Sequence, residues 1–320
     1  MADYVTRMLV PARQQYPSPL RYPGGKVKVA NFFKLLLLEN DLVGCEYVEP
    51  YAGGAGVALS LLFEEYASHI HINDLDRSIY AFWSAVLSRT DELCERIKNA
   101  SVTVEEWHRQ RAMQQAEAPD DLDLAYSTFF LNRTCRSGIL TGGIIGGYEQ
   151  MGKWKIDARW RTDDLIQRIR RIARFKTRIS LSCVDTASFL RDRLPEVEHP
   201  FTYLDPPYYA KGSTLYQNYY RHEDHVELAE LVQGLNVPWV VSYDSAPEVI
   251  AMYQGFEQAS YDLVYSAGAR QAGTEVMFFS PGLMRPSVTS PSGVPVDAVA
   301  DSRLDAQPGS GQGLRLPAAT

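Results

Sequence analysis

The sequence predicts an α/β protein with a mostly parallel sheet wrapped by helices. Strand-like apolar runs alternate with segments of helical periodicity, which is typical of parallel strands joined by helical crossovers. Two of these runs end in an acidic residue followed by a turn rich in glycine or proline. With 320 residues, 45% of them hydrophobic, the chain is long enough to bury one large core and an inserted subdomain.

The first half of the predicted core covers residues 18–83, after an arm of residues 1–17 that we expect to be flexible. A helix is expected from near Lys26, because apolar residues then recur every three to four positions up to Leu37. A strand at residues 46–49 follows and leads through a glycine-rich turn into a second helix. Residues 69–74 alternate apolar and polar side chains, which predicts another strand.

Residues 84–178 depart from this pattern and predict an inserted, mainly helical subdomain. Polar helices are expected at residues 90–99 and 103–115, followed by an aromatic and glycine-rich stretch at residues 129–148. Glycine clusters that carry Arg, Asn and Thr can form a loop that lies against a groove and presents donors to base edges. We therefore expect this stretch to be a loop whose polar groups can face a ligand.

The predicted core resumes over residues 179–284. It contains a strand at 201–204, a helix near 222–235, and strands at 238–243 and 275–280. Residues 213–220 are dense in Tyr, and they are expected either to close over a ligand or to pack in the core. Residues 285–320 contain almost no large apolar side chains, so this tail is expected to be disordered.

The DPPY motif at residues 205–208 is the strongest candidate for chemistry. Two consecutive prolines fix φ and offer no backbone N–H, so the Asp205 carboxylate and the Pro206 carbonyl can both accept hydrogen bonds from a ligand. Tyr208 adds a ring on which a flat heterocycle can stack, as extruded bases do. The motif therefore favours a planar ring with an exocyclic amino group, although a simple strand-ending turn is the alternative.

A second motif, EYVEPYAGGAGVAL at residues 46–59, joins an acidic strand end to a glycine turn. Its glycines permit positive φ and close approach of a ligand to the backbone. The Gly-Gly-x-Gly spacing matches neither the dinucleotide fingerprint nor the phosphate loop. Asp74 ends the second strand, where α/β folds commonly hold ribose hydroxyls, and it is also a candidate helix N-cap.

Four motifs in this order, PLRYPGGK at residues 19–26, VEPYAGGAG, NDLD and DPPY, resemble the D12 class of Dam-like DNA adenine N6-methyltransferases. The resemblance implies a Rossmann-like S-adenosylmethionine-dependent methyltransferase fold with a target-recognition subdomain. It implies that Asp205, Pro206 and Tyr208 are catalytic. It also implies contacts to S-adenosylmethionine from Tyr22, Lys26, Glu49, Tyr51, Gly53, Gly56, Asp74, Asp205 and, by a looser match, Asp185. Tyr51 stands where many members have Phe, which keeps the ring.

The implied partner is double-stranded DNA, although the formal net charge of the chain is −7. Residues 133–178 contain twelve basic and four acidic residues, a local charge of +8 that is typical of phosphate binding. A solvated helix face at residues 168–178 explains part of this charge equally well. Asn132, Arg133 and Arg136 are the candidate DNA contacts, unless they brace the loop.

Other features limit the remaining possibilities. Uninterrupted apolar runs such as residues 35–38 are too short to span a bilayer and the start lacks a signal-peptide core, so we expect a cytoplasmic protein without a membrane partner. Its four cysteines show no CxxC pairing, so we expect reduced thiols and no metal site. We also expect a monomer, with a cognate restriction enzyme as a possible partner.

The expected reaction is direct methyl transfer from S-adenosylmethionine to N6 of a flipped adenine. Hydrogen bonds from the amine to Asp205 and to the Pro206 carbonyl would orient a nitrogen whose lone pair is otherwise delocalised into the ring. Methylation of adenine N6 in RNA or of cytosine N4 uses the same chemistry and remains an alternative. A non-catalytic DNA-binding relative is a third reading, which the intact Asp205 and Tyr208 disfavour.

Overall fold

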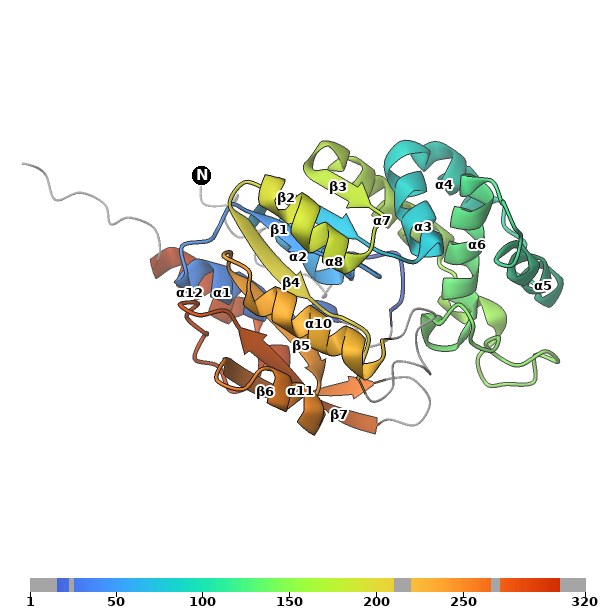
Figure 1. Cartoon of the computed structure of the whole chain (residues 1–320). Coiled ribbons are helices and arrows are strands. Elements are labelled where there is room, and N and C mark those ends of the chain that lie inside the picture. The colour runs from blue at the N-terminus through green and yellow to red at the C-terminus, as the bar shows by residue number, and fades with distance from the viewer. Residues whose placement is uncertain (1–15, 23–25, 210–219, 266–270, 306–320) are drawn as a thin grey trace, which may run out of the picture.

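The computed structural model describes residues 16–22, 26–209, 220–265 and 271–305. In this part of the chain the strands form one 7-stranded sheet in the order β3-β2-β1-β4-β5-β7-β6 (Figure 1). The strands are β1 (Cys45–Glu49), β2 (Ala67–Asn73), β3 (Ile179–Ser182), β4 (Pro200–Leu204), β5 (Trp239–Asp244), β6 (Glu257–Tyr265) and β7 (Gln271–Phe279).

The sheet is mostly parallel, as the sequence predicts. β1 pairs in parallel with β2 and β4, β2 with β3, and β4 with β5, whereas β7 runs antiparallel to both β5 and β6. The strand order reverses between β1 and β4, which creates the topological switch point at which doubly wound α/β sheets bind ligands. This order confirms the predicted Rossmann-like architecture.

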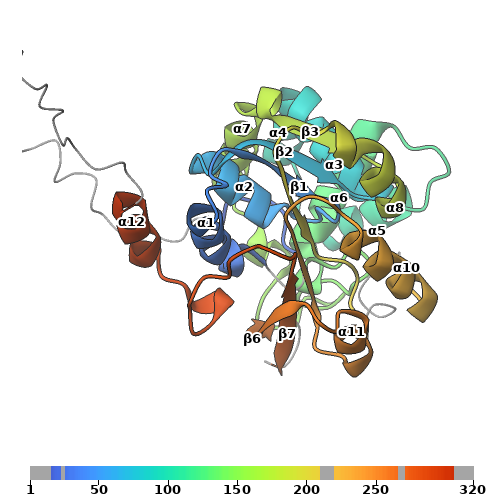
Figure 2. The ribbon, with the colours of Figure 1, turned by 60° about the vertical axis from the view of Figure 1, so that its left-hand side comes forward.

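Helices cover both faces of the sheet, as Figure 2 shows. On one face α1 packs Phe33 against Tyr203 of β4, with 4.5 Å between ring centroids. On the other face Tyr253, which follows α11, stacks on Phe278 of β7 at 4.6 Å. The helices of the core are α1 (Ala30–Glu39), α2 (Gly56–Phe63), α3 (Arg77–Ser88), α8 (Thr186–Ser188), α10 (His222–Gln233) and α11 (Pro247–Met252).

The inserted segment between α3 and β3 is mainly helical. It contains α4 (Thr90–Lys98), α5 (Val104–Met113), α6 (Asp121–Thr134) and α7 (Thr162–Ala173). Phe82 of α3 stacks on Phe129 of α6 with 6.0 Å between ring centroids. Because α3 runs unbroken across residues 83 and 84, the predicted boundary falls inside a helix, and the division into subdomains stays a prediction.

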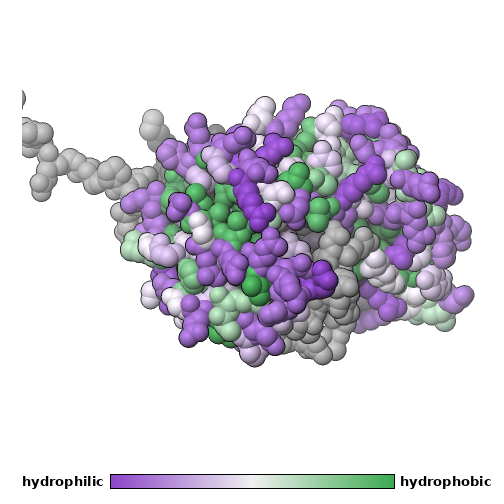
Figure 3. All heavy atoms as spheres, viewed as in Figure 1, coloured by the Kyte–Doolittle hydropathy of each residue, from purple (hydrophilic) through white to green (hydrophobic). Residues whose placement is uncertain are grey.

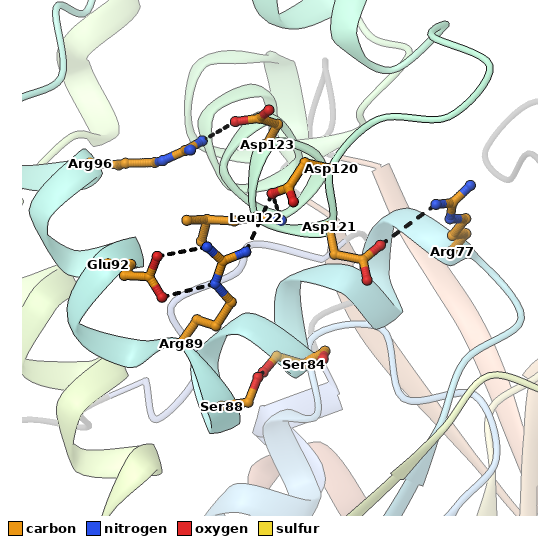
Figure 4. Close-up of polar contacts among 10 residues, drawn as sticks. All are labelled: Arg77, Ser84, Ser88, Arg89, Glu92, Arg96, Asp120, Asp121, Leu122 and Asp123. Atoms are coloured by element: carbon orange, nitrogen blue, oxygen red, sulfur yellow. Dashed lines mark hydrogen bonds and ion pairs between the residues drawn. The ribbon is translucent and has the colours of Figure 1, made fainter.

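Ion pairs at the surface join α3, α4 and α6, as Figure 4 shows. Arg89 donates to Glu92 at 2.6 Å and lies 3.4 Å from Asp120, which also caps α6 by accepting from the Leu122 N–H at 2.9 Å. Arg96 pairs with Asp123 one turn further along. These exposed pairs each contribute little to stability, so the apolar contacts of α3 with α6 fix the position of the insertion.

The tail differs from the expected disorder. The described residues beyond 285 include helix α12 (Val296–Asp305), and Val294 and Val299 are buried in the same apolar cluster as α1. The Val294 carbonyl also accepts a hydrogen bond from Asn31 Nδ2 at 3.1 Å. Val294 and Val299 therefore help to dock a segment whose composition is otherwise largely polar. The predictions for residues 1–15, 213–219 and 306–320 fall outside the described residues.

The surface of the face seen in Figure 1 is hydrophilic over most of its helices, with small apolar patches between them (Figure 3). Among the described residues, none of the helices combines the length and the apolar character needed to cross a bilayer.

Candidate active site at the carboxyl edge of the sheet

Acidic residues gather where the parallel strands β1, β2 and β4 end. Glu49 is the last residue of β1, Asp74 follows β2, and Asp205 follows β4. Because parallel strands end at the same edge, the three carboxyl groups lie on both sides of the switch point between β1 and β4. The structure thus brings together the strand-end acids that the sequence singles out.

The glycine turn after β1 is held against β2 and against Tyr22. Ala52 N–H donates to the Asn73 carbonyl at 2.9 Å, and Gly53 N–H donates to Asp74 Oδ2 at 2.8 Å. Gly53 has φ +45°, and a Cβ there would lie 2.7 Å from the Tyr22 ring. Only glycine therefore permits both this backbone conformation and the contact with Tyr22.

Asp74 is oriented by backbone donors from both sides. Its Oδ1 accepts from Asp76 N–H at 2.9 Å, and its Oδ2 accepts from Gly53 N–H. Burial and, secondarily, the charge of Asp76 raise the pKa of Asp74 to about 7. The N-cap of α3 is Asp76, which accepts from Ser78 N–H at 2.8 Å, so the capping alternative falls two residues after Asp74.

Asp205 is partly buried and belongs to a charged network with Lys26 and Glu275. Lys26 Nζ lies 2.7 Å from Asp205 Oδ1 and 3.1 Å from Glu275 Oε2. Burial raises the pKa of Asp205, the Lys26 ammonium lowers it in part, and the Glu275 carboxylate raises it further. For Lys26, burial lowers the pKa, but the two carboxylates raise it well above its ordinary value. Lys26 is therefore a cation held between two carboxylates.

Tyr208 and Ser242 complete this network. Tyr208 is 4% exposed; its hydroxyl donates to Glu275 Oε1 at 2.7 Å, and the Lys26 ammonium lies 5.3 Å from its ring centroid. Ser242 of β5 donates to Asp205 Oδ1 at 2.9 Å. The DPPY motif is therefore fixed by residues from η2 (Lys26–Val29), β5 and β7.

The other predicted cofactor residues lie around Asp74 and Asp205. Glu49 is buried and accepts from Ala58 N–H at 3.2 Å; burial and then the charge of Asp205 raise its pKa well above its ordinary value. Tyr51 shares a hydrogen bond with the Tyr220 hydroxyl at 2.9 Å. Asp185 is exposed beyond β3 and caps α8 by accepting from Ser188 N–H at 3.0 Å.

A family model for D12 class N6 adenine-specific DNA methyltransferases matches residues 22–266. The chain belongs to this family. The type II methyltransferase M.MjaIII of Methanocaldococcus jannaschii is 21% identical over 238 residues, which cover 68% of this chain and 79% of that protein. The enzyme therefore transfers methyl groups from S-adenosylmethionine to adenine N6 of DNA, as the sequence analysis predicts.

Two solved structures are similar to the enzyme. A candidate RNA methyltransferase of Pyrococcus horikoshii is 10% identical, with a TM-score of 0.38 over 77% of this chain and 78% of that one. A candidate methyltransferase of Escherichia coli, yhhF, is 11% identical, with a TM-score of 0.32 over 82% and 91%.

The residues at the carboxyl edge of the sheet fit S-adenosylmethionine. The glycine turn presents backbone without side chains next to the Tyr22 ring, and the Asp74 carboxylate lies beside it where ribose hydroxyls can donate. Glu49 and Asp205 add acidic groups that suit the cationic sulfonium and ammonium groups of the cofactor.

The candidate DNA contacts fall into different environments. Asn132 is 1% exposed: its Oδ1 accepts from Arg21 N–H at 2.7 Å, and its Nδ2 donates to the carbonyls of Arg21 and Gly138 at 2.7 and 2.9 Å. A buried amide with these partners favours the alternative that Asn132 braces the loop. Arg136, in contrast, is exposed.

Arg133 lies in a group of arginines at the junction between the core and the insertion. Its guanidinium donates to the Arg159 carbonyl at 3.0 Å and to the Pro19 carbonyl at 3.3 Å. Burial and then the charges of Arg21 and Arg168 lower its pKa to about 9. Arg21 Nη1 is buried without a hydrogen-bond partner in the described part of the chain. Positive charge is therefore concentrated beside the PLRYPGGK segment.

The basic stretch at residues 133–178 is divided between two sides of the sheet, the side where the parallel strands end and the side where they begin. Arg168 donates to the Ser18 carbonyl on the active-site side. Arg171 stacks on Phe63 at the end of α2, and Arg178 pairs with Glu65 and donates to the Ala67 carbonyl at the start of β2. Only part of the predicted patch therefore faces the same side as Asp205.

Three residues of this network, Glu275, Ser242 and Tyr261, were not predicted from the sequence. Glu275 is fully buried, and Tyr261 donates to its Oε2 at 2.6 Å. A single acid in the strand-like run at residues 275–280 is the signal that could have marked it, because buried carboxylates are rare unless they are paired.

Proposed function

We propose that Asp205, Pro206 and Tyr208 bind the target adenine, and that the glycine turn, Glu49 and Asp74 hold S-adenosylmethionine next to it. The observation that carries this proposal is the position of Asp205. It follows β4 at the switch point, and Lys26 and Ser242 fix it from two directions. Among the described residues these contacts all use Oδ1, so Oδ2 can accept from the adenine amine.

The cofactor supplies an activated methyl group, and the protein has to present adenine N6 to it. Hydrogen bonds from the amine to Asp205 and to the Pro206 carbonyl orient the nitrogen lone pair towards the methyl carbon. An ionised Asp205 also stabilises the positive charge that develops on N6. Since the ring of Tyr208 is buried, stacking on the base requires that the base enter next to it or that the ring be uncovered.

For the DNA we propose a double-stranded substrate that lies across the junction between core and insertion. Arg136 is exposed there, and Arg21, Arg133, Arg159 and Arg168 supply the positive charge that attracts phosphates. We further propose that the enzyme methylates a defined site as a cytoplasmic monomer. The type II assignment of the M. jannaschii relative supports a cognate restriction enzyme as partner.

Nucleoside mass spectrometry tests this function. The full-length protein is incubated with S-adenosylmethionine and unmethylated double-stranded DNA, and Asp205→Asn serves as the matched control because it keeps the shape of the side chain. N6-methyladenine that depends on Asp205 is the expected product. N4-methylcytosine, or methyl label that enters only RNA, would overturn the proposed substrate. Sequencing of the modified adenines then identifies the recognition site.

A further inference from the structure

Glu275 is a buried acid that contacts three groups of the active site. It lies on β7, paired in register with Asp244 of β5 and Tyr261 of β6. Its side chain is fully buried. Its two oxygens lie 3.2 and 3.1 Å from Lys26 Nζ, and they accept from the hydroxyls of Tyr208 and Tyr261 at 2.7 and 2.6 Å.

The charges of this network suit a reaction in which positive charge moves. Two carboxyl groups, Asp205 and Glu275, face one ammonium group, Lys26, so the network contains one more acidic group than it has cations. Lys26 with Asp205 alone would form a neutral pair, and its ammonium would repel the cationic methyl donor and the developing charge on N6. Glu275 compensates for that ammonium, so Lys26 can hold Asp205 without cancelling the negative charge of the site.

We propose that Glu275 is a positioning residue for methyl transfer, which acts by holding Lys26 and Tyr208 and by keeping the charge of the site negative. In the reaction, adenine N6 uses its lone pair to bond the methyl carbon while the carbon–sulfur bond breaks and its electron pair stays on sulfur. The positive charge therefore passes to N6, which then loses one proton to water. The inference rests on the proposed role of Asp205 as acceptor of the amine.

The pH profile distinguishes this role from simple packing. The ionised carboxylate of Asp205 accepts from the amine more strongly and stabilises its developing charge, so activity should fall as the pH drops through the pKa of Asp205. Glu275 raises the pKa of Asp205. Glu275→Gln removes that charge with little change in shape, so the acid limb of kcat should move to lower pH. The plateau of kcat should fall by roughly ten- to 100-fold, with KM for the cofactor nearly unchanged.

Two further variants separate the effect of the charge at position 275 from the effect of its contacts with Lys26 and the tyrosines. Glu275→Asp keeps the charge but withdraws the carboxylate from Lys26 and Tyr208, so kcat should fall while the acid limb stays at the wild-type pH. Tyr261→Phe removes one hydrogen bond to Glu275 and keeps every charge. It should lower kcat less than Glu275→Gln does and leave the acid limb in place. Circular dichroism melting checks that each variant is folded.

The outcomes separate this inference from the proposed function. If folded Glu275→Gln has the wild-type kcat, or if its lower kcat comes with an unmoved acid limb, the positioning role is wrong. If Glu275→Gln does not fold, Glu275→Asp decides, because an acid limb that shifts to lower pH despite the retained charge contradicts the inference. A wild-type enzyme that forms no N6-methyladenine, or an active Asp205→Asn, would instead contradict the proposed function.

Discussion

Replacement of Asp74 by Asn should weaken S-adenosylmethionine binding and remove a pH dependence from it. The side chain keeps its size and one acceptor, but it loses the charge that Gly53 N–H and Asp76 N–H orient. A hydrogen bond to a charged group contributes about 1.5–3 kcal/mol, so the Kd should rise roughly ten- to 150-fold.

The pH dependence follows from the pKa of Asp74, which is about 7 in the folded protein. Ribose hydroxyls donate best to the ionised carboxylate, so affinity should be highest above pH 7 and fall as the pH drops below it. At pH 6 only about a tenth of the carboxyl groups are ionised, which limits the loss to about tenfold. Below pH 7, binding should also release a proton from Asp74.

Isothermal titration calorimetry from pH 6 to 8 measures both effects. Repeating it in buffers of different ionisation enthalpy counts the protons released. Ionisation of the cofactor affects wild type and Asp74→Asn equally, so the difference between their pH curves reports Asp74. Parallel curves, or unchanged affinity in the folded variant, would refute the assignment of Asp74 to the ribose.

Further predictions concern the base, the insertion and the tail. Tyr208→Phe keeps the ring and every charge but loses the hydrogen bond to Glu275, so it should lower kcat about as mildly as Tyr261→Phe does, whereas Tyr208→Ala should lose about 1–3 kcal/mol of stacking, measured as DNA KM. Asn132→Ala should lower stability in denaturant by about 1–3 kcal/mol, because the backbone groups of Arg21 lose their partners. Arg136→Ala should impair DNA methylation and leave the cofactor affinity unchanged. If this variant methylates every site at the wild-type rate, the recognition loop lies in another segment. Deletion of residues 291–320 should lower the melting temperature, because α12 and Val299 leave α1; unchanged melting would show that this contact is not stabilising.

The strand-end acids were predictable because strand periodicity and turn chemistry are local. Glu49, Asp74 and Asp205 each follow an apolar run, and parallel strands bring such ends to one edge. The partners of these acids were not predictable, since they come from distant segments. Lys26 and Glu275 are 249 positions apart, and no local pattern connects them.

Burial explains the other differences. Asn132 was expected to face DNA because of its glycine- and arginine-rich surroundings, but α6 turns it inward onto a backbone 111 positions away. Composition was also misleading for the tail, where average polarity predicts disorder while a few apolar residues, with Val294 and Val299 the most deeply buried, make the contact. An average over many residues cannot show which few side chains meet a partner surface.

The contact between Asn132 and Arg21 has a consequence for exchanging recognition modules between enzymes of this kind. Asn132 lies at the end of α6 in the insertion, and it hydrogen-bonds both backbone groups of Arg21, five positions before Lys26. A chimaera that replaces the insertion without an amide at this position would leave both backbone groups of Arg21 without these partners and loosen residues 19–22, which lie against the glycine turn. Exchange designs should therefore treat residues 19–22 and α6 as one unit, and choose junctions in the loop after Gly138.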